Sequence, residues 1–314
     1  YSLLDGWRKV SRSHHPGQPM KFGAIYPHQE IGTDPVVIRD WAQTAESLGY
    51  SHIVAYDHIL GAVKRDRQPK LYGIYNEADA FHEPMVLFSY LAAVTEKIEF
   101  ATGILVLPQR QTALVAKQVA QIDLLSGGRM RLGVGSGWNF VEYEALNEDF
   151  SSRGKRLSEQ VELMRELWSN PVVDFDGKHH RVDGAGLNPL PQRQIPVWFG
   201  GFSDAAFKRA ARIGDGIMLG GDQESNVRAA KRCRELVTLA GREITGFGIE
   251  AFVNFQDGAD NWRRHAEQWS SLNADYVSMR AAQLKGVGPG LSSPAEHIKS
   301  LETYWNRVGD LQAV

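Results

Sequence analysis

The 314-residue sequence has one cysteine and no long apolar run. A single cysteine excludes an intramolecular disulfide, and the charged neighbours of Cys233 favour an inert thiol on a helix. No segment approaches the ~18 consecutive apolar residues that cross a bilayer, and the first ten residues lack the apolar core of a signal peptide. We therefore expect a cytoplasmic protein that does not contact a membrane.

An excess of one charge is also missing. The 35 basic and 37 acidic residues give a net charge of −2. Proteins that bind a nucleic-acid backbone are usually strongly basic, so nucleic acid is not an expected partner. With 23% charged and 43% hydrophobic residues, the composition is that of a folded globular chain and not of a disordered one.

From Met20 onward, short apolar segments alternate with segments of helical periodicity. The predicted strands cover residues 21–26, 52–56, 98–107, 130–134, 196–199, 216–219, 247–253 and 276–279. Eight strand-and-helix units predict a single (β/α)₈ TIM barrel over residues 20–314, with insertions after strands two and four. The insertions are the loop 60–82 and a hairpin within 171–194. Residues 1–19 are polar and rich in turn residues, which indicates an N-terminal extension, flexible or not native.

A doubly wound open sheet is the alternative fold. It requires a glycine-rich G-x-G-x-x-G turn after the first strand, and residues 26–32 do not provide one. The barrel is therefore the preferred prediction.

Catalytic groups of such barrels lie at the carboxyl-terminal ends of the strands. Asp57 and His58 follow the second strand and are the catalytic acid–base candidates, because imidazole titrates near neutrality and can donate or accept a proton. A structural histidine is the alternative for His58. Tyr26, His28 and Arg280 lie at other strand ends and are assigned to a substrate pocket.

Glycine-rich strand ends are candidates for cofactor binding. Residues 200–203 run directly into a predicted helix, whose free N–H groups and dipole suit a phosphate. The alternative is that Ser203 or Asp204 only caps this helix. Residues 133–139 form a second glycine-rich end, which lets a flat ring approach the strand. The candidates from these two ends and from the sixth strand are Gly135, Gly137, Asn139, Gly200, Gly201, Phe202, Ser203, Gly220 and Gly221.

Motifs for several other chemistries are missing. No His-x-x-His or Glu-x-x-His spacing accompanies His58, and the adjacent His179 and His180 fall in the hairpin insertion, so no metal site is predicted. A G-x-S-x-G nucleophile elbow is also lacking. The carboxylates Glu142 and Glu144 are near neighbours, as are Glu77 and Asp79, whereas a glycosidase needs two carboxylates on opposite strand ends.

Several segments of the chain resemble a known family. They are Tyr56-Asp-His58, Glu83-Pro84, the segment 98–108 that ends Leu-Val-Leu-Pro, the segment 116–138 with Leu-Ser-Gly-Gly-Arg and Gly-Val-Gly-Ser-Gly-Trp, and Ser152-Arg-Gly154. In order and spacing they resemble the bacterial luciferase-like oxidoreductases, especially the branch that uses coenzyme F420, a deazaflavin. The resemblance covers residues 20–310 and is most specific from Thr102 to Gly137.

The resemblance implies a homodimer of barrels, each holding a deazaflavin or FMN at the strand ends. The ring would lie against Gly103 and Ile104, where this family often has a non-prolyl cis peptide bond. Asp57 and His58 match positions near the reactive edge of the ring. Trp138 is a departure, because some deazaflavin sugar-phosphate dehydrogenases have an acidic catalytic residue there. We therefore assign Trp138 to the wall of an apolar substrate pocket.

Three functions are consistent with these residues and with the resemblance. The preferred one is an F420-dependent oxidoreductase that transfers hydride between the deazaflavin C5 and a small organic substrate, with His58 handling the proton. An FMN-dependent monooxygenase that uses reduced flavin and O₂ is the first alternative. A non-catalytic flavin-binding protein on the same barrel is the second.

Overall fold

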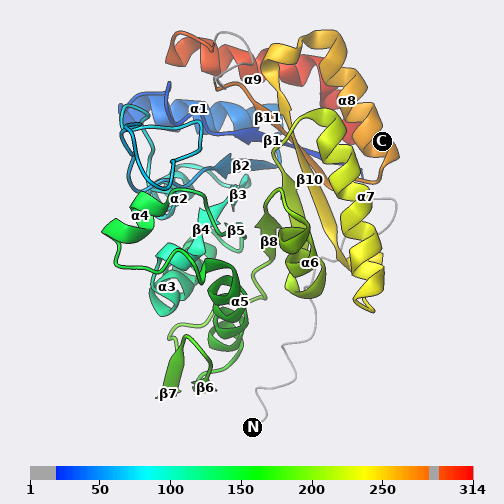
Figure 1. Ribbon diagram of the computed structural model, residues 1–314. Coiled ribbons are helices and arrows are strands. Elements are labelled where there is room, and N and C mark those ends of the chain that lie inside the picture. The colour runs from blue at the N-terminus through cyan, green and yellow to red at the C-terminus, as the bar shows by residue number, and fades with distance from the viewer. Residues whose placement is uncertain (1–18, 283–289, 314) are drawn as a thin grey trace.

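The computed structural model describes residues 19–282 and 290–313 (Figure 1). The predicted N-terminal extension therefore lies outside the described residues, except for its last position. The barrel strands are β1 (Lys21–Ile25), β2 (His52–Ala55), β3 (Glu99–Thr102), β4 (Leu105–Val106), β5 (Met130–Gly135), β8 (Val197–Gly200), β9 (Gly216–Leu219), β10 (Gly248–Asn254) and β11 (Tyr276–Arg280). They run parallel in the order β3-β2-β1-β11-β10-β9-β8-β5-β4, and β3 also pairs with β5. This last pairing closes the sheet, so the predicted TIM barrel is confirmed.

The third predicted strand is divided into β3 and β4. Between them lies the Gly103–Ile104 peptide bond, which is cis. The resemblance to the luciferase-like family had implied such a bond at this position, and the structure confirms it.

Helices surround the barrel (Figure 1). They are α1 (Pro35–Leu48), α2 (Pro84–Val94), α3 (Thr112–Leu125), α5 (Arg153–Ser169), α6 (Asp204–Ile213), α7 (Gln223–Leu239), α8 (Ala259–Ser271) and α9 (Pro294–Val308). Short 3₁₀ helices are η1 (Leu107–Gln109), η2 (Ile244–Gly246), η3 (Phe255–Asp257) and η4 (Gly309–Ala313). No helix within the described residues combines the length and the apolar character needed to cross a bilayer.

The two predicted insertions are present. The chain between β2 and α2 forms a long loop, and β5 is followed by the short helix α4 (Phe140–Ala145) ahead of α5. The hairpin β6 (Val173–Asp176) and β7 (Arg181–Ala185) is antiparallel and projects away from the barrel (Figure 1). The long loop leaves β2 at its carboxyl-terminal end, where a site is expected, whereas the hairpin lies between the end of α5 and the start of β8.

Local sequence signals fix the helix ends. At α1, the Asp34 side chain accepts a hydrogen bond from the Val36 N–H at 2.8 Å, and Pro35 occupies the first helical position. The helix ends at Gly49, whose φ of 103° is accessible to glycine at little cost.

In α7, Cys233 is fully buried, and burial raises the pKa of its thiol to about 12.

The barrel has two apolar cores. The larger one fills the space between strands and helices. The smaller one lies inside the barrel and consists of Ile25, Val54, Ala101, Trp198, Met218 and Phe252. Because side chains alternate between the two faces of each strand, these residues show which positions point inward.

The inward positions nearer the amino-terminal ends of the strands hold a buried ionic cluster. Glu250 on β10 receives a hydrogen bond from Arg131 at 2.5 Å, lies 2.8 Å from His52 Nε2, and receives one from Ser278 at 2.6 Å. Burial alone would raise the pKa of Glu250, but the charges of Arg131 and His52 and the hydrogen bonds lower it to about 2. The barrel floor is therefore charged inside, although its charges are paired.

Candidate active site at the barrel mouth

His58 lies just beyond β2, with its side chain 10% exposed. Its Nδ1 is 3.1 Å from Glu142 Oε1, and its ring contacts the rings of Tyr75, Phe81 and Trp138 at centroid distances of 5.2, 4.9 and 5.4 Å. The carboxylate favours the tautomer in which Nδ1 carries the proton. Among the described residues Nε2 has no hydrogen-bond partner, so it is available as a proton acceptor.

Glu142 is the main site residue that was not predicted from the sequence. Its side chain is 1% exposed, and Oε1 also accepts a hydrogen bond from the Leu60 N–H at 3.2 Å. It lies in the first turn of α4, which Asn139 opens. Asn139 and Glu142 have the spacing of a capping box, but that local pattern does not predict a contact with the distant loop after β2. The carboxylate orients His58 and joins α4 to the loop after β2.

Asp57 has a different environment from its neighbour. Its carboxylate accepts hydrogen bonds from Arg110 at 2.7 and 3.3 Å and from the Val106 N–H at 2.8 Å, and its side chain is 1% exposed. Arg110 in turn donates to Glu83 at 2.8 Å. Asp57 therefore anchors the segment after Ile104, which differs from the acid–base role expected for it from the sequence.

Gly103 and Ile104 lie between the inner core and the mouth. A Cβ at Gly103 would lie 2.3 Å from Val54, so the inner core packs directly on this residue. The Ile104 side chain covers Gly135 and Gly200, where an added Cβ would lie within 2.7 and 2.6 Å of it. These two glycines thus make room for Ile104.

The turn after β8 is open to solvent. Ser203 caps α6 by accepting the Ala206 N–H at 3.3 Å, and Phe202 is 80% exposed. Because the hydroxyl oxygen accepts this bond, its hydrogen remains available as a donor. The Phe202 ring lies 3.8 Å from where a Cβ at Gly220 or Gly221 would stand, so the ends of β8 and β9 adjoin here. The exposed N-terminus of α6, a helix of ten residues, together with the free hydroxyl donor of Ser203, suits a phosphate.

Gly137, Trp138 and Asn139 join β5 to α4. Asn139 accepts the Val141 N–H at 3.1 Å and donates to the Leu60 carbonyl at 3.2 Å, so it caps the helix and holds the loop. The Asn139 side chain is buried. Trp138 is half-buried between His58 and Gly73, where a Cβ on Gly73 would lie 2.2 Å from its ring. It forms a wall beside His58.

With this geometry established, the family can be assigned. Residues 20–310 match the family described as luciferase-like monooxygenase. The chain belongs to that family. Its relatives are oxidoreductases and monooxygenases, and this luciferase-like protein is accordingly an enzyme.

Three relatives illustrate the range of the luciferase-like family. An uncharacterized protein of Mycobacterium tuberculosis is 31% identical over 245 residues, which are 74% of this chain and 85% of that protein. An F420-dependent glucose-6-phosphate dehydrogenase of Nocardia farcinica is 36% identical over 229 residues, 64% of this chain and 66% of the dehydrogenase. An FMNH₂-dependent dimethylsulfone monooxygenase of Pseudomonas putida is 29% identical over 288 residues, 86% of this chain and 76% of the monooxygenase.

The fold agrees with solved structures. The coenzyme F420-dependent tetrahydromethanopterin reductase of Methanopyrus kandleri superposes with a TM-score of 0.69 at 16% identity, covering 93% of this chain and 99% of the reductase. At this identity the match supports the barrel alone. Both F420 and reduced FMN are used among the relatives of this luciferase-like barrel.

Tyr26 and His28, which the sequence assigns to a substrate pocket, are both buried. Tyr26 is fully buried and packs against Trp41 of α1 at 5.5 Å, because it follows the inward-facing Ile25 and so points outward. His28 is 1% exposed, and its Nε2 accepts the Tyr56 N–H at 3.0 Å. Burial lowers the pKa of His28 to about 3, so its ring is neutral.

Arg280 at the end of β11 points inward. It donates to Asn254 Oδ1 at 3.1 and 2.5 Å and is 6% exposed. Its charge acts on Tyr56, although burial dominates and raises the pKa of that phenol. The Tyr56 hydroxyl is buried without a hydrogen-bond partner among the described residues. Arg280 and Tyr56 thus place polar groups on the inner side of the mouth.

Proposed function

We propose that this protein is an F420-dependent oxidoreductase that transfers hydride between the deazaflavin C5 and a small organic alcohol or carbonyl compound. The observation that carries the proposal is the geometry of His58. Glu142 holds its Nδ1 at 3.1 Å, and Nε2 remains without a partner among the described residues. Interconversion of an alcohol and a carbonyl moves a proton as well as a hydride, and such a histidine can take or return it.

The residues at the mouth fit a phosphorylated flavin-type ring. Ser203 and the exposed start of α6 would hold the phosphate, and the segment at Gly103 and Ile104 would lie behind the ring. The unpartnered Tyr56 hydroxyl is a further donor on the inner side, in the part of the chain that the structure describes. When bound, the deazaflavin supplies a ring carbon that accepts or returns hydride.

The chain's own residues then supply proton transfer and exclusion of water. His58 Nε2 takes the hydroxyl proton of the alcohol, and the adjacent Glu142 carboxylate stabilises the imidazolium that forms. The rings of Tyr75, Phe81 and Trp138 shield His58 from water, which strengthens the electrostatic interaction between His58 and Glu142. Positioned acid–base groups typically contribute 10²–10⁴-fold to rate.

A second candidate is an FMN-dependent monooxygenase that uses reduced flavin and O₂. The aromatic wall around His58 favours it, because such a reaction needs a site that excludes water. The turn ending at Ser203 would serve the phosphate of either cofactor. A non-catalytic flavin-binding protein is the third candidate, and the oriented pair of His58 and Glu142 weighs against it.

The test is a titration of the purified protein with F420 and with FMN, followed by turnover measurements. We expect F420 to bind at least tenfold more tightly, and His58→Ala to lower turnover at least tenfold while cofactor affinity stays unchanged. His82→Ala is the matched control, since its Nε2 hydrogen-bonds the Gly32 carbonyl at 3.0 Å and not a carboxylate of the mouth. Tighter binding of FMN would favour the monooxygenase, and full turnover in His58→Ala would refute the role of His58.

We also propose that the protein forms a homodimer in solution, which rests on the family resemblance. Light scattering after size-exclusion chromatography measures the mass directly. A mass near the 35.0 kDa of one chain would refute it.

A further inference from the structure

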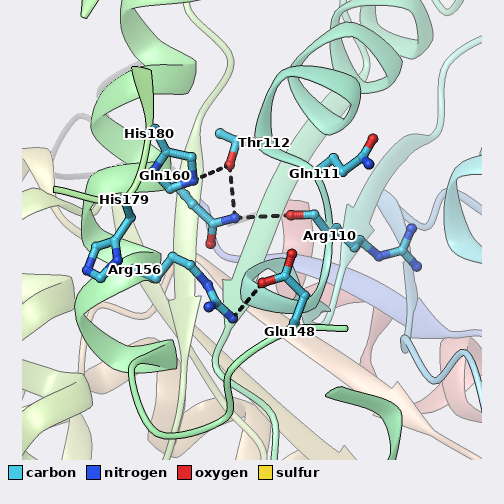
Figure 2. Close-up of a pocket in the computed structure, with 8 residues that line it drawn as sticks. All are labelled: Arg110, Gln111, Thr112, Glu148, Arg156, Gln160, His179 and His180. Carbon is cyan, nitrogen blue, oxygen red and sulfur yellow. Dashed lines mark hydrogen bonds and ion pairs between the residues drawn. The ribbon is translucent and has the colours of Figure 1, made fainter. Parts of the chain in front are cut away.

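A cavity lies on the outer side of the barrel mouth. Its volume is about 330 Å³, and it lies between the first turns of α3 and α5 and the hairpin β6–β7 (Figure 2). Gln160, Arg156 and His179 contribute to its lining, while His58 and Glu142 do not. A cavity of this size accommodates a small organic molecule.

Three buried polar atoms at this cavity have no hydrogen-bond partner among the described residues. They are Gln160 Oε1, Arg156 Nε and His179 Nε2. Buried polar atoms in folded proteins are nearly always hydrogen-bonded, so these three atoms are available to a molecule bound in the cavity. Gln160 is 1% exposed, so its oxygen is shielded from bulk solvent.

The orientation of the Gln160 amide is fixed. Its nitrogen donates to the carbonyl oxygens of Leu107 and Arg110, both at 3.2 Å, and to Thr112 Oγ1 at 3.0 Å. Exchanging oxygen and nitrogen would set the amide oxygen against two carbonyl oxygens, which repel it. The oxygen is therefore the free end, and Figure 2 shows it on the side of the amide that faces away from Thr112 and Arg110.

The cationic groups around the cavity are already neutralised. Arg110 pairs with Asp57 and Glu83, Arg156 lies 3.1 Å from Glu148, and His180 lies 2.8 Å from Glu159. An anionic ligand would therefore find little uncompensated positive charge among the described side chains here, and burying it would be costly. The cavity thus suits a neutral molecule that both donates and accepts hydrogen bonds.

We propose that this cavity binds a small neutral amide in which an N–H lies beside a carbonyl, as in a lactam. The ligand N–H donates to Gln160 Oε1, and its carbonyl accepts from Arg156 Nε. His179 also lines the cavity, and its unpartnered Nε2 would contribute a further hydrogen bond. The cavity shares Arg110 with the mouth, because its backbone binds Gln160 and its guanidinium binds Asp57.

The first test compares three probes by isothermal titration and by NMR of the full chain. We expect saturable binding of one 2-pyrrolidone per chain. N-methyl-2-pyrrolidone, which lacks the N–H, should bind at least fivefold more weakly, and acetate should bind more weakly than the lactam. Absence of lactam binding, equal binding of the methylated lactam, or tighter binding of acetate would each overturn the proposal.

Variants test the location. His179→Ala removes an unpartnered nitrogen but keeps the backbone N–H that donates to Glu159 at 2.7 Å, and we expect at least fivefold weaker lactam binding. Gln111→Trp fills the rim from an exposed position that makes no side-chain cap bond, and should abolish binding. Lys178→Ala is the matched control on the exposed hairpin and should bind as the parent protein does. Unchanged binding in both pocket variants would place the lactam elsewhere and overturn the assignment.

Discussion

Replacing Glu250 with glutamine should destabilise the barrel strongly. Glu250 is fully buried and Arg131 is 4% exposed, with its guanidinium between the rings of Trp198 and Tyr276 at 4.5 and 4.3 Å. Within the described residues, Glu250 is the carboxylate that pairs with Arg131. Breaking a buried ion pair from one side costs about 3–5 kcal/mol, because the remaining charge has no compensation. We expect Glu250→Gln to lose stability in this range.

The pH dependence gives a second estimate of the magnitude. The pKa of Glu250 falls from 4.5 to about 2 in the folded protein. At 1.36 kcal/mol per unit, this shift stabilises the fold by about 3 kcal/mol. Because the folded pKa is the lower one, this stability is present above pH 4.5 and is lost as the pH falls towards 2. The difference between parent and Glu250→Gln should shrink over the same interval.

Urea denaturation followed by tryptophan fluorescence measures the free energy of unfolding at pH 7 and at lower pH values. The double variant Glu250→Gln/Arg131→Met is the matched control, since it removes both charges and should recover much of the loss. A loss below about 1 kcal/mol in Glu250→Gln, or no recovery in the double variant, would refute the idea that the pair is held by charge.

Three further predictions concern the mouth. Ser203→Ala should weaken cofactor binding about 10- to 150-fold, as expected for a hydrogen bond to a charged phosphate; a lower melting temperature with unchanged affinity would instead show a helix cap alone. Trp138→Phe should keep cofactor affinity and change the KM for substrate, and steady-state kinetics would contradict this if KM stayed constant. Asp57→Asn should destabilise the fold by about 2 kcal/mol, less than Glu250→Gln, because Glu83 still pairs with Arg110. Denaturation at pH 7 checks this, and unchanged stability would argue for a free, chemically active Asp57.

The strands could be predicted because each is a short apolar segment between turn residues. The division of the third strand could not be read from periodicity, since residues 98–107 are typical of one continuous strand. Only the family resemblance pointed to Gly103 and Ile104. The hairpin was predicted within residues 171–194, where both of its strands lie, because its turn residues are visible in the sequence.

The site was predicted in part. The strand-end rule selected His58 as an acid–base candidate, and it also selected Tyr26 and His28 for a substrate pocket. Whether a strand-end side chain points into the barrel depends on the inward and outward alternation along the strand. For β1 this alternation is known only once Ile25 is seen to point inward. Glu142 lies 84 residues from His58, and no local pattern reveals such a contact. Similarly, the sequence does not show that the Asp57 carboxylate pairs with Arg110, which lies 53 residues away.

The ionic cluster inside the barrel has an evolutionary consequence. A Cβ at Gly23 would lie 2.3 Å from His52 Nε2 and 2.4 Å from Ser278 Oγ, so His52 fills the space that a larger residue at position 23 would need. Trp198 restricts Gly216 and Gly248 in the same way, at 2.5 and 2.3 Å. These positions can change only together with the side chains that cover them. Among homologues, each of these glycines and its covering residue should therefore be exchanged as a pair.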